Sequence, residues 1–291
     1  MLSRKKLEML DVVIYILITL VCALMLYPFL NVISVSLSTY SAYVHNPMMV
    51  WPKDFTIGAY KEIMKNGMLW RSYVNTIAVT VCGVGVGILL YILTAYPLSK
   101  KVLKGRKTLM LLIIFTMLFN GGLIPNYYLM RSLGLLDTLA SLVLPALVTG
   151  FNLILMKSFF ESLPEEIEEA ARIDGASDPY ILFRIVVPLS KPIIATLCLF
   201  SAVGYWNNFF NAVVYIRSTD NWPLMLYLRE VIEGASTMAR SANAAEMGAE
   251  MMTSETIKYA TLVLVMVPIL CVYPFLQRYF VKGIMLGSVK G

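Results

Sequence analysis

The chain has 291 residues, of which 58% are apolar and only 14% are charged, against roughly a quarter charged in an ordinary soluble domain. With a mean hydropathy of +0.72, a water-soluble fold of this size would have too few polar side chains to cover its surface. The composition therefore excludes an ordinary soluble protein and predicts an all-α integral membrane protein.

Long stretches without Asp, Glu, Lys or Arg predict six transmembrane helices, because about 20 helical residues cross the hydrocarbon core of a bilayer. We expect these helices to form one transmembrane domain over residues 1–291. A removable signal peptide is the rival interpretation of the first apolar run, but the run is too long and no small-residue cleavage pattern follows it. In chain order, the expected spans cover approximately residues 12–35, 73–98, 108–128, 138–157, 192–216 and 257–278.

The lysines and arginines predict the orientation of these spans. Most of them lie in the N-terminal segment, the loops 100–107 and 157–191, and the C-terminal tail. Because loops rich in Lys and Arg stay in the cytoplasm, we expect both termini on the cytoplasmic side and the loop 217–256 outside. Topology then explains the net charge of +6, and nucleic acid is not an expected partner.

The sequence offers no pattern typical of a metal site, a nucleotide site or a catalytic site. His45 is the single histidine, and Cys22, Cys82, Cys198 and Cys271 all fall in apolar stretches. No disulfide, metal ligand set or phosphate-binding loop is expected from these residues. We therefore expect no cofactor in this chain and no catalytic residue, which disfavours a membrane-embedded enzyme.

The predicted spans carry no ionisable residue near their middle. Proton- or sodium-coupled carriers commonly place carboxylates, lysines or histidines there. Backbone carbonyls at broken helices can also bind sodium, so a secondary carrier or facilitator for a polar solute is kept as the alternative. If the protein moves a solute, we expect the energy to enter through a partner at the cytoplasmic surface.

The cytoplasmic loop 161–191 has the pattern of two short helices joined by a turn. Ser162 begins a capping-box pattern, so we expect it to be the N-cap of the first helix with Pro164 in the first turn. We expect that helix to stop at Gly175, because glycine adopts the left-handed C′ conformation that other residues avoid.

Ser177 or Asp178, followed by Pro179, opens the second helix of this loop. Pro188 is expected to end or kink it. The resulting pair is too apolar to remain uncovered in water, and from composition alone an amphipathic loop lying on the membrane surface is an equal alternative.

The same loop carries a specific run of residues. The run is Glu169-Ala170-Ala171-Arg172-Ile173-Asp174-Gly175-Ala176, then Ile185 and Val187-Pro188. It resembles the EAA loop of ATP-binding-cassette importer permeases, which has Leu-Pro where this chain has Val187-Pro188. The resemblance implies a type I importer permease fold with six spans, in which the loop couples the permease to an ATPase. The coupling residues that the resemblance implies are Glu169, Ala170, Ala171, Asp174, Gly175 and Pro188.

The resemblance extends over the chain and is closest to carbohydrate-uptake permeases of the maltose-transporter type, within them to the LplC/YtcP-like branch. It rests on Phe55 to Tyr60, Arg71 to Thr76, Asn120 to Pro125, Trp206 to Phe210 and the tail from Gln277 to Gly291. It implies a multi-pass protein of the bacterial cytoplasmic membrane that moves carbohydrates, expected to be oligosaccharides, by alternating access. The implied partners are a second and different permease, two ATPase subunits that bind ATP and magnesium, and an external solute-binding protein.

Uncharged amides and aromatic rings in span five are the expected lining of a polar substrate path. Asn207, Asn211 and Tyr215 fall on one helical stripe at i, i+4 spacing. Hydrogen bonding between helices of two subunits is an equal alternative for them. The candidate path residues are Asn120, Tyr205, Trp206, Asn207, Asn208, Asn211 and Tyr215.

Glycines and prolines predict local geometry at three further places. The segment from Asn120 to Pro125 indicates a broken helix, which could line the path or serve only as a packing kink. Gly83, Gly85 and Gly87 predict close helix packing within the subunit. In the external loop, a short helix is expected over about residues 223–234.

Overall fold

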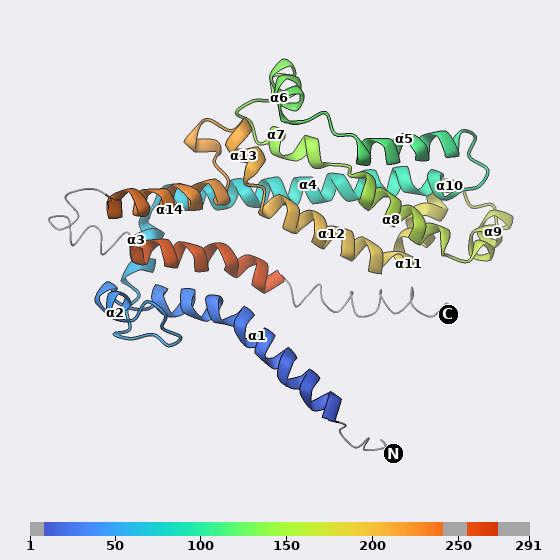
Figure 1. Ribbon diagram of the computed structural model, residues 1–291. Helices are drawn as coiled ribbons and strands as arrows, with labels where there is room; N and C mark the ends of the chain where they lie inside the picture. The colour runs from blue at the N-terminus through green and yellow to red at the C-terminus, as the bar shows by residue number, and fades with distance from the viewer. Residues whose placement is uncertain (1–8, 241–254, 273–291) are drawn as a thin grey trace. The chain divides into compact units, whose positions relative to one another are not determined.

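The computed structural model describes residues 9–240 and 255–272 (Figure 1). Over these residues the regular secondary structure is helical, apart from one antiparallel bridge between Ser38 and Phe55. The all-α class predicted from composition is confirmed for the described residues. The expected C-terminal tail from Gln277 to Gly291 lies outside them.

The contacts within the chain define two compact units. Among the described residues, the first comprises 9–67, 228–240 and 255–267, and the second comprises 68–227 and 268–272. Helix α14 (Leu224–Arg240) begins in the second unit and continues in the first. It starts where the sequence predicts the external helix and extends beyond the expected end near residue 234.

The first unit is built around α1 (Met9–Ser36), α2 (Tyr40–His45) and α3 (Gly58–Lys65). The large apolar side chains of α1 are exposed along most of its length, which is the surface expected of a helix that faces lipid. Only its C-terminal end is buried, where Val35 packs with Ala42 and Met49.

The second unit is built around α4 (Gly67–Ser99), a helix of 33 residues. Its most deeply buried side chains include Tyr91 on α4, which packs in one cluster with Met156 and Leu197. The other elements of this unit are α5 (Arg106–Leu118), α6 (Leu123–Ser132), α7 (Ala140–Val143), η1 (Leu144–Ala146), α8 (Gly150–Glu161), α9 (Glu165–Ile173), α10 (Asp178–Ile181), η2 (Leu182–Val186), α11 (Val187–Leu189), α12 (Lys191–Trp206), α13 (Phe210–Tyr215) and η3 (Thr219–Asn221).

Three described helices are long and apolar enough to cross a membrane: Met9–Ser36, Gly67–Ser99 and Glu255–Val272. Three further helix pairs have suitable composition but are sharply bent, so the described residues contain up to six spans if each pair is one span. The bends are 111° between Arg106–Leu118 and Leu123–Ser132, 51° between Ala140–Ala146 and Gly150–Glu161, and 78° between Asp178–Leu189 and Lys191–Trp206.

The expected span 192–216 is wrong as one continuous helix, because α12 ends at Trp206 and α13 begins at Phe210. Asn207 is the C-cap of α12, and its side-chain Nδ2 donates to the Val203 carbonyl at 3.0 Å. Asparagine favours such local hydrogen bonds to the backbone over a continued helix. Consequently Asn207 does not share a helical stripe with Asn211.

Two glycines of α4 allow close approach of neighbouring backbone and rings. A Cβ placed on Gly83 would lie 2.4 Å from the ring of Tyr205, and one on Gly87 would lie 3.0 Å from the Leu147 carbonyl oxygen. A Cβ on Gly85 would meet no atom of the described residues within 4 Å. The predicted close packing is therefore confirmed at Gly83 and Gly87 and is wrong at Gly85.

Candidate functional site

The turn between α9 and α10 lies near the Ser99 end of α4 (Figure 1). Helix α9 ends at Ile173, and Gly175 follows with φ +81. The Gly175 N–H donates to the Arg172 carbonyl at 3.0 Å, and the Ala176 N–H donates to the Ala171 carbonyl at 3.0 Å. This pair of bonds is a Schellman motif, so the stop predicted at Gly175 is confirmed.

The predicted start of this helix is wrong. Helix α8 continues to Glu161, so Ser162 is its C-cap and donates from Oγ to the Phe159 carbonyl at 2.7 Å. Pro164, with φ −60 and ψ 124, takes the N-cap position of α9 without a side-chain cap. The hydroxyl that the capping box requires is therefore used by the preceding helix. Acidic residues in the first turn of α9 still face the positive end of the helix dipole.

The helices after the turn follow the predicted pattern with one shift. Of the two residues predicted to open α10, Ser177 occupies the N-cap position and Asp178 is the first helical residue, with Pro179 in the first turn. The helical backbone continues past Pro188 to Leu189, and the 78° bend falls at Ser190. Pro188 therefore precedes the bend, and its side chain is exposed.

Helix α9 has one inward face and one outward face. Glu168 is 6% exposed, and Ala171 packs against the core of the second unit. Glu169 and Ala170 are exposed, as are Asp174 and Gly175 beyond the helix end. Of the coupling residues implied by the resemblance, only Ala171 is therefore partly buried against the rest of the chain.

The outward face also carries apolar side chains that the sequence analysis did not single out. Ile173 is 86% exposed and Tyr180 is 56% exposed. A groove of about 540 Å³ lies beside them, lined by Ala171, Asp174, Gly175, Ala176, Ser177, Tyr180 and Ile185. Exposed apolar groups beside a groove are typical of a surface that another protein covers.

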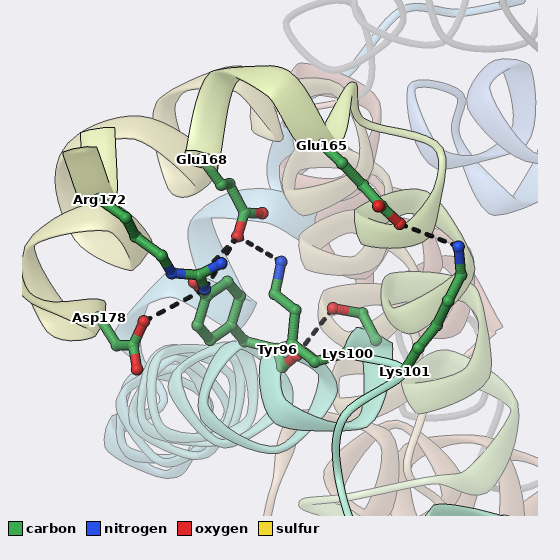
Figure 2. A network of polar contacts seen from close by, with 8 residues as sticks. Tyr96, Lys100, Lys101, Glu165, Glu168, Arg172 and Asp178 are labelled. Atoms are coloured by element: carbon green, nitrogen blue, oxygen red, sulfur yellow. Dashed lines mark hydrogen bonds and ion pairs between the residues drawn. The ribbon is translucent and has the colours of Figure 1, made fainter. Parts of the chain in front are cut away.

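The inward face of α9 is held by ionic and hydrogen bonds to the end of α4 (Figure 2). The Glu168 carboxylate pairs with the Lys100 ammonium and accepts a hydrogen bond from the Tyr96 hydroxyl at 3.2 Å. The Lys100 ammonium lies 4.7 Å from the centroid of the Tyr96 ring. Because Glu168 is buried, these partners stabilise a carboxylate that would otherwise be costly to desolvate.

Arg172 extends this network from α9 to α10. Its guanidinium lies 3.8 Å from the Glu168 carboxylate and donates to Asp178 at 3.3 Å. Burial acts to lower the pKa of Arg172, but the hydrogen bond to Asp178 and the negative charges nearby outweigh burial and raise it. The guanidinium therefore stays charged and joins the two short helices of the turn.

At the opposite end of α4, Asp137 fixes the backbone that follows α13. Its carboxylate accepts backbone hydrogen bonds from Ser218 at 2.8 Å and from Arg217 at 3.0 Å. These two bonds lower the pKa of Asp137 from its ordinary value. Asp137 has φ +59, a left-handed conformation that Asp and Asn tolerate better than most residues.

The structure separates the candidate path residues into two groups. Asn120 follows α5, and its side-chain Oδ1 accepts the Gly122 N–H at 2.9 Å in the break before α6. The broken helix predicted over Asn120 to Pro125 is confirmed by the 111° bend there. The other candidates lie at the end of α12 and in α13.

At the end of α12, the candidates differ in exposure and bonding. Tyr205 is buried and donates to the Val143 carbonyl at 3.3 Å, and Asn208 donates to the Leu142 carbonyl at 3.4 Å. Asn207 is exposed, Asn211 is half-buried and Tyr215 is buried. These contacts lie within the chain, so they do not themselves identify a substrate contact.

An apolar cavity of about 660 Å³ lies along α4 and α12, and Thr80 and Trp206 are part of its lining. The Trp206 Nε1 and the Thr80 Oγ1 are buried, and neither has a hydrogen-bond partner among the described residues. Unpaired buried polar atoms are costly. Trp206 is therefore the path candidate with unused hydrogen-bonding capacity beside a cavity.

Metal and disulfide sites are missing from the described part of the chain. No group of three or more His, Cys, Asp or Glu side chains could hold a metal ion there. The four cysteines lie within this part and are unpaired.

The long apolar helices of the described residues define a helical membrane protein. The sequence model of the family described as "Binding-protein-dependent transport system inner membrane component" matches residues 107–286. The chain belongs to this family of importer permeases.

Two relatives and one solved structure extend the match beyond the family region. Protein LplC of Bacillus subtilis strain 168 is 45% identical over 269 residues, which cover 92% of this chain and 90% of that protein. The polygalacturonan/rhamnogalacturonan transport system permease protein YtcP of the same strain is 42% identical over 285 residues, covering 97% and 98%. A crystal structure of a bacterial ABC transporter involved in the import of the acidic polysaccharide alginate matches with a TM-score of 0.85 and 36% identity, covering 96% of this chain and 99% of that one.

Proposed function

We propose that this chain is the transmembrane permease subunit of an ATP-driven importer for oligosaccharides in a bacterial cytoplasmic membrane. The observation that carries the proposal is the two-faced helix α9. Its inward face is fixed to the chain through Glu168, whereas its outward face leaves Ile173 and the groove beside Gly175 uncovered. A rigid element with an uncovered apolar face is suited to receive force from a partner.

In this proposal the turn of α9 and α10 faces the cytoplasm and docks on an ATPase subunit. Glu169 and Asp174 are exposed beside the groove, where they can pair with basic groups of that subunit. Ala170 keeps the helix narrow, and Gly175 provides the sharp turn. ATP and magnesium are bound by the ATPase subunits and not by this chain.

We propose the complex to contain a second, different permease, two ATP-binding cassette subunits and an extracytoplasmic solute-binding protein. Closure of the ATPase pair moves the two docked turns together. Rigid-body rocking of the permeases then opens the path to one side of the membrane at a time. Both termini of this chain lie in the cytoplasm in this arrangement.

The substrate path is proposed to pass the break after α12. Uncharged amides at Asn207 and Asn208 and the indole of Trp206 can form hydrogen bonds to sugar hydroxyls without trapping the substrate. YtcP carries polygalacturonan and rhamnogalacturonan in its name, and the solved structure belongs to an alginate importer. We therefore propose a carbohydrate substrate, and uronate-containing oligosaccharides are the first to be tested.

The test is capture of the tagged chain from its native membranes in mild detergent, followed by mass spectrometry. We expect an ATPase subunit and a second permease to be recovered, and no such pair from membranes that carry the untagged chain. The captured complex is then assayed for ATP hydrolysis with its solute-binding protein and either oligogalacturonate or a neutral oligosaccharide. Recovery of the chain alone, with solute transport that needs no ATP, would instead support a secondary carrier.

A further inference from the structure

We propose that the charges of the loop 100–106 clamp the coupling helix α9 to α4, so that α4 moves with α9 as one rigid body during the ATPase cycle. The inference rests on the proposed function and identifies the transmembrane helix that receives the movement. The sequence alone explains the cations of this loop by membrane orientation. The structure gives three of them specific partners.

The pairs connect two segments far apart in the chain. Residues 161–168 supply the acids and residues 100–106 supply the cations, and the contacts recur from the end of α8 into α9. The three pairs are Glu161 with Arg106, Glu165 with Lys101, and Glu168 with Lys100. Lys157 adds a second contact to Glu161 at 2.7 Å.

The three pairs differ in strength because they differ in exposure. The Glu165 and Lys101 side chains are 71% and 80% exposed, and such surface pairs contribute little. The Glu168 side chain is 8% exposed and the Lys100 side chain is 29% exposed. Separating Glu168 from Lys100 would leave a buried carboxylate without its cation, which is strongly unfavourable.

Glu168 interacts with residues of both α4 and α9. The Tyr96 hydroxyl donates to it from α4, and Arg172 approaches it from α9 itself (Figure 2). A movement of α9 away from α4 would therefore break a hydrogen bond and an ion pair together. By contrast, the polypeptide that leads from α9 to α12 passes the turn at Gly175 and the 78° bend at Ser190. The side-chain contacts of the clamp therefore connect α9 to the transmembrane helices more directly than the polypeptide backbone does.

The clamp is tested by measuring a distance between α9 and α4 with and without ATP. Two spin labels are attached to cysteines placed at Glu166 on α9 and at Leu89 on α4, both exposed, with the four native cysteines replaced. The labelled chain is captured with its partner subunits, and the label–label distance is measured by pulsed electron spin resonance in the nucleotide-free and ATP-bound complexes.

We expect the same distance distribution in both states of the complex that retains Lys100. Lys100→Ala should shift or broaden the distribution when ATP binds, and Lys100→Arg, which keeps the charge, should restore it. Lys101→Ala is the matched control, because it removes a neighbouring lysine from an exposed pair, and it should leave the distance unchanged.

A change of the distance on ATP binding in the complex that retains Lys100 would overturn the clamp, even if the Lys100→Ala chain failed to assemble. An unchanged distance in an assembled Lys100→Ala complex would also overturn it. Failure to recover any ATPase with the tagged chain would refute the proposed function on which the clamp rests, so the two failures are distinguishable.

Discussion

The ring of Tyr205 on α12 lies directly against Gly83 on α4, with two ring carbons 2.4 Å from the position that a Cβ would take. Gly83→Ala must therefore displace a buried ring whose hydroxyl is bonded to the Val143 carbonyl. Overpacking of this kind costs about 1–3 kcal/mol. We expect a lower thermal unfolding temperature in detergent for Gly83→Ala.

Gly85→Ala is the control for this prediction, because Gly85 lies in the same helix and a Cβ there meets no atom within 4 Å in the part of the chain that the structure describes. It should leave stability unchanged or raise it, since alanine is the better helix former. Equal effects of the two substitutions would contradict the packing of Tyr205 on Gly83.

Gly175→Asp should uncouple ATP hydrolysis from transport while the protein remains inserted in the membrane. Gly175 has φ +81, and no atom of the described residues lies within 4 Å of its Cβ position. The damage is therefore expected from backbone strain of about 1–3 kcal/mol and from the added charge, not from a clash. The check is ATP hydrolysis and solute uptake by the same reconstituted complex. Wild-type uptake by this variant would refute the role of the turn.

Gly134→Asp is the matched control for strain. Gly134 also has a left-handed backbone, with φ +69, and no atom of residues 9–240 or 255–272 lies within 4 Å of its Cβ position. It lies outside the α9–α10 turn, so we expect it to lower stability by a similar amount without changing the uptake per ATP hydrolysed.

Ile173→Ala should weaken the recovery of the ATPase with the tagged chain. The side chain is 86% exposed, so its removal should not alter the stability of the isolated chain. Buried anchors of an interface cost about 2 kcal/mol or more when truncated. Val102→Ala removes a side chain that is 90% exposed on the loop before α5, and it should leave ATPase recovery unchanged. Equal recovery with both variants would place the ATPase on another surface.

Acid should remove the contribution of Asp137 to folding. Because backbone hydrogen bonds lower its pKa in the folded protein, its carboxylate stabilises the fold above the ordinary aspartate pKa of about 3.9. That contribution is lost as the pH falls through the lowered folded-state value. Asp137→Asn is the variant to use, because asparagine keeps a side-chain oxygen that accepts hydrogen bonds and adopts a positive φ readily. The variant should be less stable than wild type near pH 7, and thermal unfolding curves should converge as the pH falls below about 4.

The features that were predictable from the sequence are those set by one residue and its neighbours. Gly175 ends a helix because its backbone can be left-handed, and the segment from Asn120 to Pro125 breaks one because it combines an amide, two glycines and a proline. Gly83 packs closely because it has no side chain. Each of these signals is read within a few residues.

The errors arose where two local signals compete. Ser162 can cap the helix that follows it or end the one that precedes it, and the longer helix α8 uses it. Asn207 fits an apolar span by composition, but its side chain bonds the backbone and ends α12. Hydropathy alone does not show whether such a polar residue continues a helix or ends it.

The pairing of Glu168 with Lys100 could not be read from one sequence, because 68 positions separate the two residues. Each residue is already explained by its neighbours in the sequence. Glu168 is an acid in the first turn of a helix, and Lys100 is a cation of a cytoplasmic loop. Only the fold shows that the acid is buried and that the cation lies against it.

The sharp bend between α5 and α6 has a consequence for how the protein is made. Helix α5 has 13 residues and α6 has 10, and neither reaches the roughly 20 residues needed to cross a bilayer alone. The backbone groups released at the break must be satisfied by protein or by water in a cavity, because lipid offers no hydrogen bonds. The two halves therefore cannot be released one by one into lipid during synthesis. We expect them to stay at the insertion machinery until α8, which packs against α5, and α13, which packs against α6, have been made. Nascent chains that end after α5 should therefore remain associated with that machinery.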